Sequence, residues 1–247
     1  MKSLLLFAAC FSLMMKSGFA TETIYHSDLP SGANPAAYPT PQQDWLAEVQ
    51  RRFDRYSGKH ADIVFDGDSI TNRWEGTGGE VWRQRFAANS ADFGIEGDHV
   101  EHVLWRLSKG QMDGVDPKLV VLLIGTNNSG RDSAEQIADG IKVLVAKYKE
   151  VCPNAHIVLM GIFPRGANPE DGSRRKVAEV NKLVASLDDG NRVSFLDIGS
   201  KFLEPDGTIA TTTMSDSLHP TAKEYVVWAD ALQPFIDKYV SKPLNAP

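Results

Sequence analysis

The stretch FDGDSIT, residues 65–71, follows an apolar run and contains three side chains that could attack a substrate: Asp66, Asp68 and Ser69. Read as D-x-D, the stretch suggests an aspartate nucleophile that works with a metal ion, as in many phosphatases. Read as G-D-S, it suggests a serine nucleophile and an esterase. The two interpretations predict different enzymes, and the rest of the chain has to decide between them.

A serine nucleophile needs a base, and the base needs a group that orients it. The stretch SDSLHP offers His219 as the base and Asp216, three residues earlier, as the orienting carboxylate. The oxyanion formed on attack needs donors that are fixed in advance. We expect these donors to be the backbone N–H of Ser69, the backbone N–H of Gly97 and the side-chain amide of Asn127. Gly97 has no Cβ that would block an approaching acyl oxygen.

The elements that must position these residues alternate along the chain. Short apolar segments at 61–65, 91–95, 118–125, 156–162 and 193–198 predict five strands, and helical spacing occupies 44–53, 80–88, 100–107, 133–151, 174–187 and 222–240. Such alternation predicts an α/β fold with a parallel sheet and helices on both faces. Asp132 or Ser133 could cap the helix at 133–151, and Pro234 could kink or divide the last helix.

The candidate residues follow predicted strands, where ligands bind in open sheets of this type. GDSIT follows the first strand, GIEGD the second and GTNN the third, and SDSLHP precedes the last helix. None of these loops resembles a dinucleotide fingerprint or a Walker phosphate loop.

The four blocks together resemble the SGNH (GDSL) hydrolases, a superfamily of esterases and lipases. The matching blocks are GDSI at 67–70, GIEGD at 94–98, GTNN at 125–128 and DSLH at 216–219. The resemblance implies a three-layer αβα sandwich of flavodoxin-like type with a five-stranded parallel sheet. It also implies Ser69 as nucleophile, Gly97 and Asn127 as oxyanion donors, His219 as base and Asp216 as its partner, with no metal and no cofactor.

A narrower resemblance points to the substrate. FGIEGDHVEHVLWRLSKG, IFPRG and PDGTIATTTMSDSLHPTAKEY are similar to the catalytic subunits of platelet-activating-factor acetylhydrolase and their bacterial relatives. This similarity implies an esterase for short, chiefly acetyl, acyl groups, on carbohydrates or, alternatively, on acetylated phospholipid or lysophospholipid. Trp74, close to the nucleophile in sequence, could stack against a sugar ring, whereas Trp82 and Trp105 are expected in the core.

Three alternatives compete with this interpretation. A magnesium-dependent phosphatase with Asp66 as nucleophile would need a downstream acidic cluster, but Asp188-Asp189 lies at a helix end rather than a strand end. HVEH at 99–102 could suggest a metal pair, but without further ligands it reads as one surface and one packing histidine. A non-catalytic carbohydrate-binding module would leave the nucleophile, base and oxyanion donors unused. We therefore expect an enzyme with a serine nucleophile.

The N-terminus predicts export. Lys2 precedes an apolar stretch, and small residues at 18 and 20 suit a signal peptidase, so we expect a signal peptide at 1–20. An extended arm at 21–43 and a hydrolase domain at 44–247 follow, in a periplasmic or extracellular protein. The apolar stretch is too short for stable membrane insertion, and lipid anchoring on Cys10 is the less favoured alternative.

The net charge and the cysteine content exclude one class of partner and one kind of covalent cross-link. Residues 1–20 carry Lys2, Lys16 and no acid, so 24 basic and 32 acidic residues remain and the net charge is −8. That balance argues against nucleic-acid binding, which depends on Lys and Arg neutralising phosphates. Cys152 is the single cysteine after cleavage, which excludes an internal disulfide.

Overall fold

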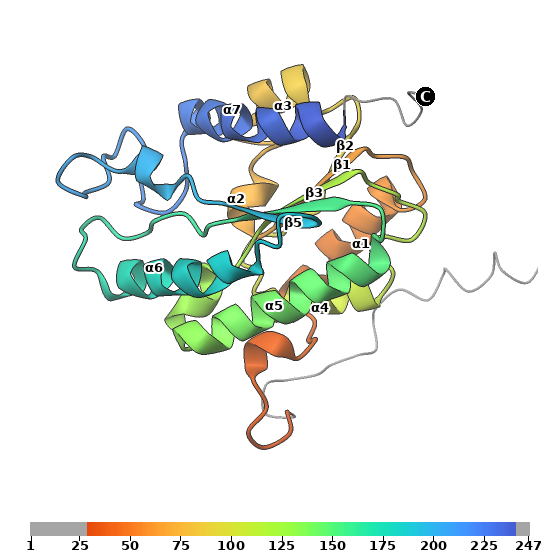
Figure 1. Cartoon of the computed structure of the whole chain (residues 1–247), viewed down its shortest axis with the longest axis horizontal. Coiled ribbons are helices and arrows are strands. Elements are labelled where there is room, and N and C mark those ends of the chain that lie inside the picture. Colours follow the sequence, from red (N-terminus) through yellow and green to blue (C-terminus); the bar gives the residue numbers. More distant parts are fainter. Residues whose placement is uncertain (1–28, 241–247) are drawn as a thin grey trace, which may run out of the picture.

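The centre of the molecule is a five-stranded parallel sheet in the order β2-β1-β3-β4-β5 (Figure 1). This computed structural model describes residues 29–240. The strands are β1 (Ile63–Gly67), β2 (Ser90–Asp92), β3 (Leu119–Leu123), β4 (His156–Met160) and β5 (Val193–Leu196). This strand order is that of flavodoxin-like sheets, so the predicted fold class is confirmed.

Helices connect the strands and cover both faces of the sheet (Figure 1). The α-helices are α1 (Leu46–Tyr56), α2 (Ser69–Asn72), α3 (Gly79–Arg85), α4 (Val100–Ser108), α5 (Ala134–Val151), α6 (Gly172–Val184) and α7 (Ala222–Tyr239). Short 3₁₀ helices are η2 (Pro35–Ala37), η3 (Gln43–Trp45), η4 (Asn127–Gly130), η5 (Ala185–Leu187) and η6 (Gly199–Phe202). In Figure 1, α3 and α7 lie above the sheet, and α5 and α6 lie below it.

Alternate residues of the strands face two separate apolar cores. In β3, Val120 and Leu122 join one core together with residues of α1, α4, α5 and α6. The neighbouring Leu119, Val121 and Leu123 join the other core, which contains residues of α3 and α7. Burial on both faces explains why the strand sequences are continuously apolar. The sheet is therefore a rigid base whose carboxyl edge carries the loops of the site.

Capping side chains mark the starts of α2, α5 and α6. Ser133 caps α5. Its hydroxyl accepts the backbone N–H of Gln136, and the Gln136 side chain accepts the backbone N–H of Ser133, which confirms the predicted start. Pro234 lies inside α7 without dividing it. The strand predicted at 91–95 is shorter in the structure and spans Ser90–Asp92, although Phe93 and Ile95 still donate backbone hydrogen bonds to Phe65 and Gly67. The short helix α2 was not expected.

The N-terminal segment lies along the domain. The predicted signal peptide at 1–20 lies outside the described residues, as does the beginning of the arm predicted at 21–43. The later part of the arm contains η2, which packs against α4 and α5. Among residues 29–240, no helix is long and apolar enough to cross a membrane.

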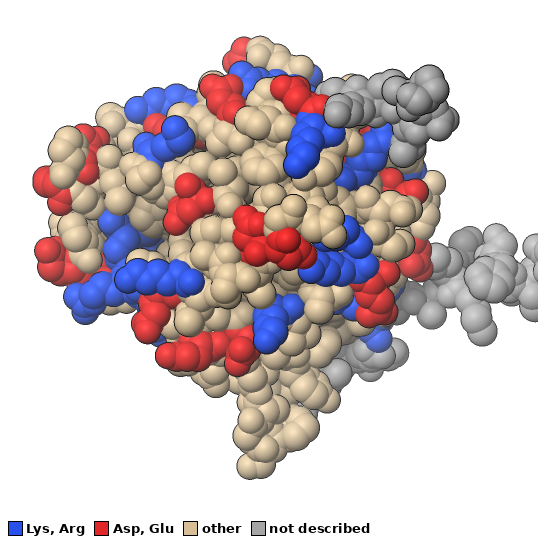
Figure 2. All heavy atoms as spheres, in the orientation of Figure 1, with Lys and Arg blue, Asp and Glu red and all other residues tan. Residues whose placement is uncertain are grey.

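Acidic and basic side chains are interspersed over the face of the molecule shown in Figure 2. Lys and Arg do not gather there into one continuous stripe. A nucleic-acid site normally needs such a basic stripe.

Candidate active site

Ser69 is the first residue of α2, at the point where β1 ends. Asp68 caps this helix, since its Oδ1 accepts the N–H of Ile70 at 2.9 Å. The turn requires glycine at position 67, where a Cβ would lie 2.0 Å from the carbonyl oxygen of Leu123. As the first helical residue, Ser69 has a backbone N–H without an acceptor inside the helix. The turn thus presents both the hydroxyl and the backbone N–H of Ser69.

A chain of hydrogen bonds joins Ser69 to the loop before α7. Ser69 Oγ lies 2.9 Å from His219 Nε2, and His219 Nδ1 lies 2.6 Å from Asp216 Oδ2. Asp216 Oδ1 also accepts the backbone N–H of His219 at 2.8 Å. Partial burial opposes ionisation of Asp216, but hydrogen bonds from the ring and backbone of His219 outweigh it and lower the carboxyl pKa to about 2. Asp216 is therefore an anion that holds the imidazole by its Nδ1 proton.

The turn between Asp216 and His219 has an uncommon backbone conformation. Ser217 has φ +58°, the one positive value found for a non-glycine residue between residues 29 and 240. Its carbonyl accepts the N–H of Gly166 from the loop after β4, at 2.9 Å. Non-glycine residues rarely adopt this region unless their surroundings enforce it. The contact with Gly166 helps to hold the turn that places the Asp216 carboxylate within hydrogen-bond distance of the His219 ring.

Gly97 and Asn127 lie on two adjoining loops. The N–H of Ile95 donates to the carbonyl of Gly67 at 3.1 Å, which fixes the loop of Gly97 against the nucleophile turn. The Asn127 Nδ2 donates to the carbonyl of Asp98 at 2.9 Å, which ties the loop after β3 to the same loop. The predicted donors thus come from three loops at the carboxyl edge of the sheet.

This arrangement has the parts needed for acyl transfer. A hydroxyl, an imidazole and a carboxylate lie in hydrogen-bonded series, which is the order required of nucleophile, base and orienting group. Only 4% of the surface of Ser69 is exposed, so access to the hydroxyl is narrow.

The comparison with protein families identifies the chain. Residues 65–226 match the model of the GDSL-like Lipase/Acylhydrolase family. The chain belongs to this family. It is 39% identical over 207 residues to platelet-activating factor acetylhydrolase IB subunit alpha1 of Homo sapiens, covering 81% of this chain and 88% of the relative. It is 36% identical over 201 residues to the alpha2 subunit of Gallus gallus, covering 78% and 86%.

Solved structures share the fold. A GDSL-like lipase from Bacteroides thetaiotaomicron aligns with a TM-score of 0.61 at 17% identity, covering 79% of this chain and 97% of the other. An acetylxylan esterase from Geobacillus stearothermophilus aligns with a TM-score of 0.55 at 18% identity, covering 77% and 98%. The family and its acetylhydrolase relatives show that this GDSL protein is a carboxylic ester hydrolase. The alternative of a non-catalytic module is therefore wrong.

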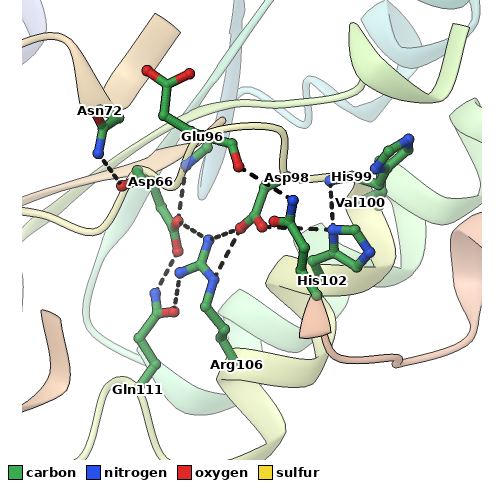
Figure 3. A network of polar contacts seen from close by, with 12 residues as sticks. Asp66, Asn72, Glu96, Asp98, His99, Val100, His102, Arg106 and Gln111 are labelled. Atoms are coloured by element: carbon green, nitrogen blue, oxygen red, sulfur yellow. Dashed lines mark hydrogen bonds and ion pairs between the residues drawn. The ribbon is translucent and has the colours of Figure 1, made fainter. Parts of the chain in front are cut away.

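Asp66, the nucleophile of the phosphatase alternative, lies in β1 and is fully buried in a polar network (Figure 3). Its Oδ1 accepts Arg106 Nη2 at 2.9 Å, and its Oδ2 accepts the amide of Gln111 and the hydroxyl of Tyr148. Arg106 also donates to Asp98 Oδ2 at 2.8 and 3.1 Å. Because every oxygen of Asp66 is engaged inside the core, the phosphatase interpretation of FDGDSIT is wrong.

Arg106 remains charged in this interior. Burial alone lowers the pKa of its guanidinium, but the carboxylates of Asp66 and Asp98 outweigh this effect and raise it. Breaking such a buried pair leaves an uncompensated charge. Arg106 thereby joins the nucleophile strand to the Gly97 loop through Asp98.

Trp74 is not available to a substrate. None of its surface is exposed, and its ring packs edge-on against Phe65, Phe86 and Tyr225. The expectation that Trp74 could stack against a sugar is therefore wrong, because Trp74, two residues after α2, is buried in the core. Trp82 and Trp105 are buried, as predicted.

The histidines of HVEH lie together with Glu101 at the start of α4. Possible ligand atoms of His99, Glu101 and His102 lie within 4.8 Å of one another. The oxygens of Glu101 accept hydrogen bonds from Arg131 at 2.7 Å and Asn128 at 2.9 Å. Nδ1 of His102 accepts the N–H of His99 at 3.0 Å (Figure 3). The side chains of Glu101 and His102 thus bind groups of the fold itself.

Several supporting residues escaped the sequence analysis. Arg106, Gln111 and Tyr148 hold Asp66, and Gln42 contacts the Gly97 loop. One signal was present: Arg106 stands between bulky apolar residues of a helix that is otherwise buried. An arginine in such a position needs a buried acid as partner. The sequence does not indicate which acid that is.

Proposed function

We propose that this GDSL hydrolase is an exported serine esterase that removes acetyl groups through an acyl-enzyme on Ser69. The observation that carries the proposal is the series Ser69 Oγ, His219 and Asp216, with contacts of 2.9 and 2.6 Å. A hydroxyl is a weak nucleophile until an adjacent base takes its proton. His219 occupies that place.

In the first step, Ser69 Oγ bonds to the ester carbonyl carbon while His219 Nε2 takes the hydroxyl proton. The oxyanion receives hydrogen bonds from the N–H groups of Ser69 and Gly97 and from the Asn127 amide. The bond from carbon to the alcohol oxygen then breaks, and the leaving alcohol takes the proton from His219. The Asp216 carboxylate stabilises the transient imidazolium.

In the second step, water replaces the alcohol. His219 Nε2 accepts a proton from the water as its oxygen bonds to the acyl carbon, and the proton then passes to Ser69 Oγ as acetate leaves. Atoms and charge balance, since one ester and one water give one acid and one alcohol. No step requires a metal ion or a cofactor.

The surroundings of Ser69 favour a small acyl group. The residue is largely covered, since only 4% of its surface is exposed. A confined setting suits a methyl group better than a long chain.

Two candidates remain for the alcohol part of the substrate. The export signal predicted at 1–20 and the shared fold with an acetylxylan esterase support an acetylated carbohydrate. The relatives named platelet-activating factor acetylhydrolase support an acetylated phospholipid as the second candidate. We favour the carbohydrate, because an exported enzyme meets polysaccharide outside the cytoplasm.

The test compares the purified protein with Ser69→Ala and with the matched control Ser186→Ala, at an exposed position in η5. Ser69→Ala should lower the kcat for p-nitrophenyl acetate by at least about 1000-fold, and Ser186→Ala should leave it unchanged. Retained hydrolysis in Ser69→Ala would refute the mechanism. Acetate release from acetylated xylan and from an acetylated phospholipid then decides the alcohol, and a preference for long p-nitrophenyl esters would exclude the acetyl assignment.

A further inference from the structure

We infer that Gln42, in the segment before α1, is a positioning residue that fixes the direction of the Gly97 N–H. The inference rests on the proposed role of that N–H as an oxyanion donor. Gln42 itself touches the loop and not the reacting atoms. Through Gln42, the segment before α1 contributes to the esterase site.

The Gln42 amide lies directly over the Gly97 loop. Its Nε2 donates to the carbonyl oxygen of Glu96 at 3.3 Å. A Cβ built on Gly97 would lie 3.0 Å from the same nitrogen. Since only the NH₂ end of an amide can donate to a carbonyl, this contact also fixes which way the Gln42 amide points.

The carbonyl of Glu96 and the N–H of Gly97 belong to one peptide group. In a trans peptide these two bonds point in opposite directions, and no cis peptide occurs in residues 29–240. When Gln42 holds the Glu96 carbonyl on one side, the Gly97 N–H must face the other side. Rotating this one peptide would turn the donor away from the site.

The turn that contains this peptide can exist in two forms. The N–H of Asp98 donates to the carbonyl of Ile95 at 3.2 Å, and Gly97 has φ +73°, which is a type II turn. A type I turn closes the same contact with the central peptide turned over and a negative φ at Gly97. Glycine adopts either sign of φ readily. The glycine therefore permits both forms, and the hydrogen bond from Gln42 selects type II.

Gln42 can act in this way because its own segment is anchored. The N–H of Thr40 donates to the carbonyl of Glu101 at 3.3 Å. Ala36 is fully buried against α5, where Gly140 leaves room for it, since a Cβ at 140 would lie 2.5 Å from the Ala36 carbonyl oxygen. The segment thus docks on α4 and α5 and delivers one amide to the Gly97 loop.

The test replaces Gln42 with Met, which has similar length but no donor, in the full-length protein. The control is Gln50→Met, which makes the same chemical change where the amide bonds Asp54 on the exposed side of α1. We expect Gln42→Met to lower the kcat for p-nitrophenyl acetate about tenfold with KM within about twofold. This loss is smaller than the roughly 100-fold cost of deleting an oxyanion donor, because the type II turn stays partly populated. Gln50→Met should match the wild type.

A readout independent of activity accompanies the kinetics. Gln42→Met should move the Gly97 amide resonance in ¹⁵N NMR spectra and lower the affinity for a trifluoromethyl ketone, which forms an oxyanion on Ser69. Unchanged kcat, or a lower kcat with the Gly97 resonance unmoved, would overturn the inference. If Gln42→Met does not fold, the isosteric Gln42→Glu, which also lacks the donor, replaces it under the same criteria. Activity surviving in Ser69→Ala would instead refute the proposed function, without bearing on the Gly97 conformation.

Discussion

The side-chain amide of Asn127 donates a hydrogen bond to the main-chain carbonyl of Asp98 at 2.9 Å. This bond ties the loop after β3 to the loop that carries Gly97. The Asn127 NH₂ group has two hydrogens, and the bond to Asp98 uses one of them. The second remains for an oxyanion, so one amide both joins the loops and can donate to the reacting group.

Asn127→Ala should lower the kcat for p-nitrophenyl acetate by about 100- to 1000-fold, because a donor fixed in advance for the oxyanion is lost. KM should change little, since the ground-state carbonyl carries less charge than the oxyanion. Steady-state kinetics check this. Asn154→Ala, at an exposed position, is the control and should behave as the wild type. Near wild-type turnover in Asn127→Ala would remove Asn127 from the mechanism.

Asp216→Asn should lower kcat by at least about 100-fold, since an amide cannot hold the imidazole by its Nδ1 proton as the carboxylate does. The pKa of Asp216 is about 2, so the carboxylate stays ionised at all mildly acidic pH values. Steady-state kinetics of Asp216→Asn beside the wild type measure this loss. Near wild-type turnover in Asp216→Asn would contradict the role of the carboxylate in holding the imidazole.

Asp66→Ala should destabilise the fold by about 3 kcal/mol or more, because it leaves Arg106 and Tyr148 short of a buried partner. Urea unfolding measures the change, and Asp54→Ala on the exposed side of α1 is the control. The fraction that remains folded should retain esterase activity, since Asp66 does not contact Ser69 Oγ. Unaltered stability with complete loss of activity would argue for a catalytic Asp66.

Asp68→Asn should change how stability depends on pH. Burial raises the pKa of the Asp68 carboxyl to about 7, whereas in the unfolded chain it titrates near 3.8. Between about pH 4 and 7 the folded protein holds a proton that the unfolded chain has released, so the free energy of unfolding falls as pH rises through this window. The side-chain amide introduced by Asp68→Asn would keep the oxygen that caps α2 but cannot titrate.

Urea unfolding at pH 4.5 and pH 8 measures this effect. Relative to the wild type, Asp68→Asn should lose less stability between the two values, by about 1–3 kcal/mol. Part of the dependence should remain, because burial also raises the pKa of Asp92, to about 8. An identical pH dependence in the variant and the wild type would show that Asp68 is ionised in the folded protein.

The sequence by itself determined the succession of strands and helices along the chain and the four blocks of site residues. Strands such as β3 are buried on both faces, so their composition is apolar throughout and can be recognised without a structure. Three of the blocks follow such strands and the fourth directly precedes the last helix, and parallel strands end at one edge of the sheet. Local pattern therefore predicted that Ser69, Gly97, Asn127 and His219 would gather there.

Only the tertiary structure decided what the remaining polar and aromatic residues do. Trp74 reads as a possible sugar platform, but the packing of Phe65 and Tyr225 around it places it in the core. Asp66 reads as a nucleophile, but Arg106, 40 residues away, binds it in the interior. Gln42 carries no signal at all, because its contact with Glu96 spans 54 residues. Such contacts join residues that are far apart in the chain, so the local spacing of residue types does not predict them.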